Sequence, residues 1–392
     1  MRDGGEDRFI PPACESIYGG ASDGRGCYSR ARVVFGFHTA LALRRSLHDQ
    51  KMKAFSMGLI DEGRSHLESL PFGGISHEEW MRGADSPEKT YNSRLPRSLP
   101  RPSEFAEMRE QLHERWQNAV LDEPAHVMLG TRGRSRATRQ MVPHRCTEEL
   151  PARSLHRLTD DLFVVSAELA MCQAMHGEGD FIRELQLLWE ACGTYCTKLT
   201  GVSTQKGALY ELNPLTDPRK LLSFCRKNPS VRGSGRVLRC GRFLEGGSAS
   251  PRETDLALLL GLHERYGGFG LGIPKMNWVV EASEEARAIS GKNSFRCDLC
   301  WPEAKIDVEY QSDLEHRGEA SRIDDSRRAN ALMAMGWSVI GVTNSEASSL
   351  SSINAIAESA RRRLRLPLRS RIGDLADRRS KLCSKLGLAG RW

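Results

Sequence analysis

Helix-like and strand-like hydrophobic patterns alternate between residues 251 and 366. Proline favours the first position of a helix, so Pro251 after the polar Ser250 predicts a helix start. The pattern predicts, in order, a helix from Pro251, strands over 276–281, 295–301 and 304–311, a helix over 318–335, a strand over 337–343 and a helix over 348–366. The two middle strands are joined by a tight Pro302-Glu303 turn and form a hairpin. This order predicts a mixed sheet with helices packed on it.

The 392 residues divide further by composition. Residues 1–30 are rich in glycine and charge and are predicted to be disordered. Residues 31–234 are predicted to be mostly helical with short strands, and they include a proline-rich, linker-like stretch at 82–103. The sheet-forming domain spans 235–366, and residues 367–392 are predicted to be a basic C-terminal tail. The chain as a whole is therefore assigned to the α/β class, of the α+β type.

Composition also limits the class of protein. No stretch approaches the ~18 uninterrupted apolar residues of a membrane helix, and the first thirty residues lack the apolar segment of a secretion signal. The 11 cysteines are an odd number scattered along the chain, which favours reduced thiols over a disulfide framework. On a strand, Cys297 and Cys300 are predicted to lie on opposite faces, which disfavours a zinc site. We expect a soluble, cytoplasmic protein with no membrane partner.

Positive charge is concentrated near the C-terminus. The net charge is +7, and residues 361–392 hold eleven Lys and Arg against two Asp. Such a segment suits the phosphates of nucleic acid, with Arg361, Arg362 and Arg363 as the first candidate contacts. The alternative is a solvated tail without a partner.

A second basic stretch lies between the predicted short strands at 127–129 and 162–165. Its basic residues and the histidines around them are His126, Arg132, Arg134, Arg136, Arg139, His144 and Arg145. The stretch is either a phosphate-binding loop or a solvated surface loop, and the sequence leaves both open.

Three carboxylates in the C-terminal domain are predicted to converge. Glu253 lies on the first helix, Asp298 in the first hairpin strand and Glu309 in the second. Residues two apart on a strand share a face, so Asp307, Glu309 and Gln311 point the same way, and Asp298 comes near Glu309 across the hairpin. Buried carboxylates in apolar strands are costly unless they are paired or bound to metal. Converging carboxylate oxygens suit Mg²⁺ or Mn²⁺, which activates water and neutralises charge on a phosphate.

This pattern resembles the PD-(D/E)xK nuclease superfamily, and more closely the small domain similar to very-short-patch-repair endonucleases. The resemblance runs from about Ser250 to Thr343. The segments that carry it are Ser250-Pro251-Arg252-Glu253, Asp298-Leu299-Cys300-Trp301-Pro302, Val308-Glu309-Tyr310-Gln311-Ser312, His316, Arg322-Ile323-Asp324-Asp325-Ser326-Arg327-Arg328 and Gly336-Trp337-Ser338-Val339-Ile340. Their order, spacing and flanks match together.

The resemblance implies a restriction-endonuclease-like mixed sheet flanked by helices, and a Mg²⁺- or Mn²⁺-dependent DNA endonuclease. Glu253, Asp298 and Glu309 would be the catalytic metal ligands. The helix that carries Arg322, Arg327 and Arg328 would contact DNA phosphates. Gln311 stands where the superfamily has a catalytic lysine. Glutamine is neutral, so it orients water or phosphate only by hydrogen bonds.

Two hypotheses follow from this departure. In the first, the protein is a metal-dependent nuclease in which Gln311 positions the water. In the second, it keeps the fold, has lost the chemistry and acts as a DNA-binding regulator. The layout of the N-terminal 230 residues, including the run from Leu162 to Leu169, loosely resembles antitoxins of type IV toxin–antitoxin systems. The expected partners are therefore DNA and, from this second resemblance, a toxin protein.

Overall fold

The computed structural model describes most of the chain. The described residues are 33–48, 95–115, 119, 121, 123–147, 150–151, 154–159, 161–197, 208–311, 319–367 and 374–388. The N-terminal segment at 1–30, residues 82–94 of the linker-like stretch, and His316 lie outside them. Within the described part, no helix combines the length and the apolar character that a membrane span requires.

The N-terminal region is built on a five-stranded mixed sheet in the order β3-β2-β1-β5-β4. Its elements are β1 (Val33–Phe35), α1 (Phe37–His48), α4 (Pro102–Arg115), β2 (Ala125–Leu129), β3 (Met141–Arg145), β4 (Leu155–Arg157) and β5 (Leu162–Val165). The central strand β1 runs parallel to β5 and antiparallel to β2, and all three of its residues are buried. The strands are short, as expected, but they join into one sheet that the sequence analysis did not predict.

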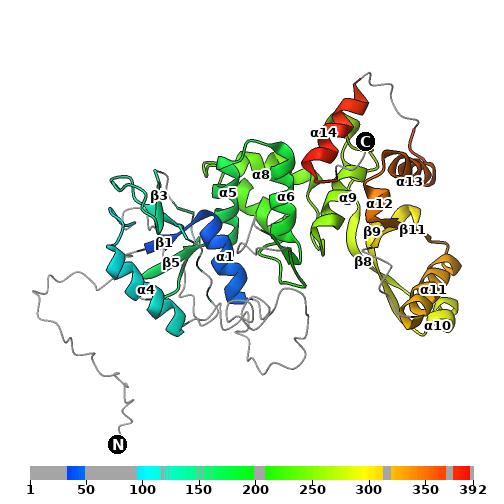
Figure 1. Ribbon diagram of the computed structural model, residues 1–392, viewed down its shortest axis with the longest axis horizontal. Helices are drawn as coiled ribbons and strands as arrows, with labels where there is room; N and C mark the ends of the chain where they lie inside the picture. The colour runs from blue at the N-terminus through cyan, green and yellow to red at the C-terminus, as the bar shows by residue number, and fades with distance from the viewer. Residues whose placement is uncertain are drawn as a thin grey trace, which may run out of the picture.

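A group of helices links this sheet to the C-terminal region, as Figure 1 shows in green. They are α5 (Ala167–Gly177), α6 (Phe181–Cys192), α7 (Pro218–Lys227) and α8 (Ser234–Cys240), with a small ribbon of β6 (Tyr195–Cys196) and β7 (Leu209–Tyr210). Side-chain caps begin three of them: Ser166 accepts from the Leu169 amide before α5, Asp180 accepts from the amides of Ile182 and Arg183 before α6, and Asp217 accepts from the Lys220 amide before α7. Helix α6 packs on the first helix of the C-terminal domain, and one apolar core runs through both regions.

The C-terminal domain has the predicted mixed sheet, in the order β11-β10-β9-β8 (Figure 1). Its elements are α9 (Pro251–Gly261), β8 (Lys275–Glu281), α10 (Glu284–Ser290), β9 (Ser294–Trp301), β10 (Ile306–Gln311), α11 (Glu319–Ala334), β11 (Ser338–Thr343), α12 (Asn344–Ala347), α13 (Leu350–Arg363) and α14 (Leu375–Lys385). Strands β9 and β10 form the predicted antiparallel hairpin, and β11 returns parallel to β10. The predicted α+β class, with mixed sheets flanked by helices, is confirmed.

Two apolar clusters hold helices on the two faces of this sheet. The main core joins α9 and α13 to Leu299 and Val308, whereas a second cluster joins α10 and α11 to Cys300 and Val339. The helix α10 was not predicted from the sequence. It packs mainly against α11, and its short, charged sequence has little periodicity of its own.

Candidate functional site

The predicted carboxylates meet where β9 and β10 part. The ladder between the two strands ends at the pair Leu299 and Val308, so the next residues, Asp298 and Glu309, lie across from each other beyond it. The Tyr310 amide donates to Asp298 Oδ2 over 3.3 Å. The side chain of Asp298 therefore fills the space between the diverging strands.

Glu253 reaches this point from the first turn of α9. Ser250 is the N-cap, and its hydroxyl accepts from the Glu253 amide over 3.1 Å. The Glu253 carboxylate in turn accepts from the Ala249 amide and from Asn277 Nδ2, both over 2.9 Å, and from the Ser250 hydroxyl over 3.1 Å. Glu253 is thus buried and held by three hydrogen bonds at the helix N-terminus, where negative charge is favourable.

Arg328 on α11 is the cation of the site. Its Nη1 forms an ion pair with Glu309 Oε1, and its Nη2 lies 3.5 Å from Asp307 Oδ2 and donates to the Arg296 carbonyl. The Arg328 side chain is only 18% exposed. One guanidinium therefore bridges Asp307 and Glu309, the two carboxylates that the strand period places on one face of β10.

Negative charge in the site exceeds what Arg328 neutralises. Burial, followed by the charge of Glu253, raises the pKa of Asp298 to about 6. Burial also raises the pKa of Asp307 to about 9, and Arg328 offsets only part of this effect. The raised pKa favours the protonated form of Asp307, and Arg328 forms its close ion pair with Glu309.

The sheet is irregular at the level of Asp298. Asn277 on β8 has left-handed backbone with φ of 48°, and the pairing of β8 with β9 omits Asn277 and Asp298. Leu299 packs in the main core, but Cys297 packs in the second cluster together with Cys300. The prediction that the two thiols lie on opposite faces is therefore wrong, because β9 does not alternate regularly through Asp298.

The arrangement of the carboxylates does not fit a divalent cation as it stands. The oxygens of Glu253 already accept three hydrogen bonds, and Glu309 is paired with Arg328. Asp307 has no solvent exposure. Over the described ranges, no three His, Cys, Asp or Glu side chains are grouped closely enough to hold a metal ion.

Gln311 lies next to this cluster but points along the sheet. A methyl group added to Gly341 on β11 would come 2.7 Å from Gln311 Nε2. Gly341 pairs with Glu309, so the Gln311 amide folds over the gap that the missing side chain leaves. A longer lysine at 311 would have to find a different path.

The arginines that were predicted to contact phosphate fall into different environments. Arg327 is exposed on α11, and the Arg322 side chain lies outside the described part of that helix. Arg362 and Arg363 are exposed at the end of α13. Arg361 is buried: it donates to the carbonyls of Phe269 and Pro367 and lies 3.7 Å from Glu264. The prediction that Arg361 binds nucleic acid is therefore wrong, because its guanidinium closes backbone carbonyls inside the domain.

The described part of the C-terminal segment is not a free tail. Residues 375–385 form α14, which packs against residues 264–266 and against α6. Arg379 on α14 is buried, donates to the carbonyls of Gly267 and Gly268 over 3.2 and 3.1 Å, and lies 3.9 Å from the centre of the Phe269 ring. Basic residues in this segment therefore anchor a helix, which charge counting alone does not reveal.

We expect Arg379→Met to release α14 from the domain. The change removes buried hydrogen bonds from a charged donor, so it should cost about 2 kcal/mol of local stability. Hydrogen exchange of the α14 amides measures the opening, and Lys381→Met, at an exposed position of the same helix, is the control. Equal protection of α14 in both variants would contradict an anchoring role.

Two polar residues beside the carboxylates were not predicted from the sequence. Asn277 donates to Glu253 and accepts from Arg296 Nε over 2.6 Å, so it links the helix carboxylate to the sheet. Asp307 was placed on the face of Glu309 but not in the site. Its position inside the run Ile306-Asp307-Val308 was the available signal, because an acidic residue in a buried strand needs a partner.

Comparisons with known proteins add little to this geometry. No family model and no solved structure matches the chain. "Uncharacterized protein MT2308" and "Uncharacterized protein Rv2248", from two strains of Mycobacterium tuberculosis, are each 25% identical over 100 residues. The match covers 26% of this chain and 32% of each relative, so the chain spans about a third of the relatives' length. The resemblance to PD-(D/E)xK nucleases therefore stays a prediction.

Proposed function

We propose that the protein is a DNA-binding regulator whose C-terminal domain carries a nuclease-type acidic site without metal-dependent cleavage. The observation that carries this proposal is the ion pair between Arg328 and Glu309 at the centre of the carboxylates. A resident guanidinium supplies positive charge where a nuclease of this type would use a divalent cation. Gln311, a neutral residue in place of the superfamily lysine, supports the same conclusion.

Exposed groups around the site support the binding half of the proposal. Trp278, on the edge strand β8 beside Asn277, is 44% exposed. An exposed indole stacks on nucleic acid bases without regard to sequence. Arg296, Arg327, Arg362 and Arg363 are exposed on the same domain, and their charges suit backbone phosphates.

The test combines cleavage and binding on the full chain. Plasmid and single-stranded DNA are incubated with Mg²⁺ or Mn²⁺ and the wild type, Asp298→Asn or Glu309→Gln. We expect no metal-dependent cleavage by any of them and unchanged DNA affinity in both variants. Robust wild-type cleavage that Asp298→Asn abolishes would overturn the proposal and favour a metal-dependent nuclease.

The binding surface is tested separately. Trp278→Ala should weaken DNA binding about tenfold, because stacking of one base contributes about 1–3 kcal/mol. In the double variant Arg362→Ala and Arg363→Ala, the slope of log affinity against log salt concentration should become shallower by about 0.9 for each lost phosphate contact. Tyr210→Ala, an aromatic residue that is 49% exposed on the small ribbon of β6 and β7, is the control. Equal DNA affinity of Trp278→Ala and Tyr210→Ala would show that the surface around Trp278 does not bind DNA.

A further inference from the structure

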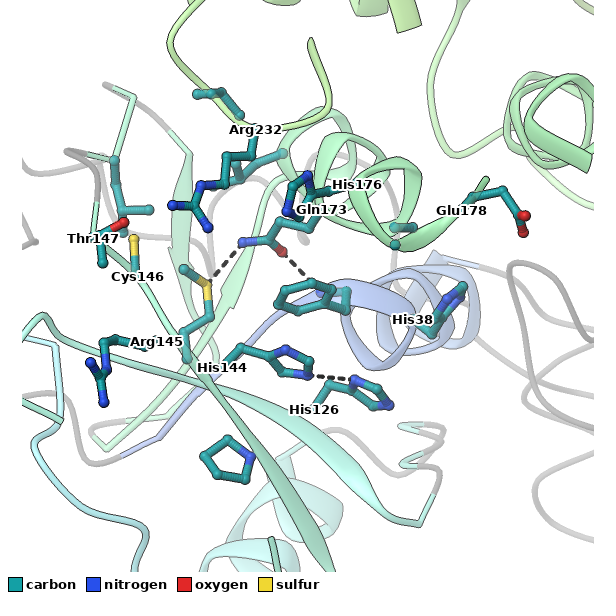
Figure 2. A pocket seen from close by; sticks show the side chains of 18 of the residues that line it. His38, His126, His144, Arg145, Cys146, Thr147, Gln173, His176, Glu178 and Arg232 are labelled. Carbon is teal, nitrogen blue, oxygen red and sulfur yellow. Dashed lines mark hydrogen bonds between the residues drawn. The ribbon is translucent and has the colours of Figure 1, made fainter. Parts of the chain in front are cut away.

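A cavity of about 820 Å³ lies in the N-terminal region, separate from the carboxylate site. Its walls come from the start of α1, from β2 and β3, from α5 and α6, and from the loop before α8 (Figure 2). The lining is mixed: apolar side chains such as Leu169 and Leu187 alternate with histidine and arginine. Cavities of this size and mixture bind small molecules.

One wall is a stack of rings. The rings of Phe37 and His144 lie 3.8 Å apart between centres at 27°, and those of His144 and His126 lie 4.9 Å apart at 14°. His126 Nδ1 and His144 Nε2 share a hydrogen bond of 2.8 Å, visible in Figure 2. Burial, followed by the neighbouring histidines, lowers the pKa of His144 to about 4. At neutral pH this wall is therefore aromatic and uncharged.

This wall is held in place by a strained residue. Phe37 has left-handed backbone with φ of 53°, which is unfavourable for a bulky side chain. Its amide donates to Gln173 Oε1 over 2.9 Å, and Gln173 Nε2 lies 3.2 Å from Met128 Sδ. Gly36 has no room for a side chain, because a Cβ would come 2.9 Å from the same Gln173 oxygen. Strain that surrounding contacts enforce is typical of binding sites.

Basic side chains line the space next to the cavity, on the side of Arg145. Arg145, the last residue of β3, lines both this cavity and an adjoining hollow of about 560 Å³. The hollow is also lined by Arg134 and Arg136, and none of the described residues that line it is acidic. Arg134, Arg136 and Arg145 are exposed, and none of them forms an ion pair with another described residue. Guanidinium groups that line one hollow suit a phosphate, because arginine binds phosphate oxygens through paired N–H donors.

The start of α1 lies at the larger cavity, not at the hollow that the arginines line. Phe37 and His38 open α1 and line the cavity, and the first turn of the helix carries no acidic residue. Among the residues that line the larger cavity, Glu178 is the one carboxylate within the described ranges.

We propose that this pair of cavities binds a nucleoside phosphate. The base lies in the larger cavity beside the ring stack that begins at Phe37, and the phosphate lies in the adjoining hollow with Arg134, Arg136 and Arg145. A free nucleotide and the 5′-terminal nucleotide of a DNA strand share this chemistry. This proposal does not depend on the function proposed for the carboxylate site, so each of the two can be disproved without the other.

Calorimetry on the full chain tests the proposal. The probes are a nucleoside monophosphate, the same nucleoside without phosphate, and a short single-stranded DNA with a 5′-phosphate or a 5′-hydroxyl. We expect saturable binding of the phosphorylated probes and at least about tenfold weaker binding in Arg145→Met, which corresponds to about 1.4 kcal/mol. Arg132→Met, an exposed arginine of the same loop that lines neither cavity, should bind like the wild type.

The results distinguish a free nucleotide from the 5′-terminal nucleotide of a DNA strand. Tighter binding of the 5′-phosphorylated strand than of the monophosphate assigns the terminal nucleotide, and the reverse assigns the free nucleotide. A ligand-dependent change in the NMR signals of the His144 ring places the base at the aromatic wall. Absence of saturable binding by every probe, or equal affinity of Arg145→Met and Arg132→Met, would overturn the proposal.

Discussion

Arg328→Met is expected to destabilise the C-terminal domain by about 3 kcal/mol at pH 8, because removal of one partner leaves a largely buried carboxylate uncompensated. Glu309 loses its ion pair, and its charge then adds to those of Asp298 and Glu253. At pH 5 the cost should be smaller, since the pKa of Asp298 is about 6 and this carboxyl is then mostly protonated. Urea denaturation at the two pH values measures the difference.

Two variants make the Arg328 result specific. Arg327→Met alters the exposed neighbour on the same helix and should change stability by less than about 0.5 kcal/mol. Glu309→Met added to Arg328→Met should recover much of the loss, because an apolar pair tolerates burial better than a lone charge. If Arg328→Met is as mild as Arg327→Met at pH 8, Arg328 does not neutralise the site.

Asp307→Asn is expected to change how stability depends on pH. The pKa of Asp307 is raised by burial from 3.8 to about 9, so the folded protein holds this proton more tightly than the unfolded chain. The resulting stabilisation is complete below pH 4 and is lost as the pH rises towards 9. Its slope is at most about 1.4 kcal/mol per pH unit, or about 4 kcal/mol between pH 5 and 8.

The asparagine variant keeps the shape of the side chain but cannot titrate. As the pH rises through this window, the free energy of unfolding of the wild type should fall relative to that of the variant. Urea unfolding at pH 5, 6, 7 and 8 measures this difference. Asp298→Asn is the matched comparison: the pKa of Asp298 is about 6, so its effect should end near pH 6. Parallel profiles for the wild type and Asp307→Asn would show that Asp307 is ionised in the folded state.

The C-terminal fold was predictable because its pattern is local. Strand period, the Pro302-Glu303 turn and the cap at Ser250 each act within a few residues. The five-stranded N-terminal sheet was not predictable, because its three-residue strand β1 carries too short a pattern and pairs with strands about ninety and about one hundred and thirty residues further along the chain.

The closeness of the carboxylates was predictable from the sequence, but their ion pairs and charge balance were not. Glu253, Asp298 and Glu309 were found because acidic residues in buried elements stand out in a sequence. The partners of Arg328 and Arg361 were not predicted. Both arginines lie in runs of basic residues, and the sequence does not show which arginine of a run is buried. Only the tertiary contacts distinguish a guanidinium that holds carboxylates or carbonyls from one that is exposed for phosphate.

Titration of the wild type with Mn²⁺, followed by calorimetry in the absence of DNA, tests the central claim most directly. If the ion pair of Arg328 with Glu309 stands in place of a metal ion, we expect no saturable binding up to about 1 mM, a range in which a preformed carboxylate site would take up the ion. Saturable Mn²⁺ binding that is lost in Asp298→Asn would contradict the claim and identify the cluster as a metal site.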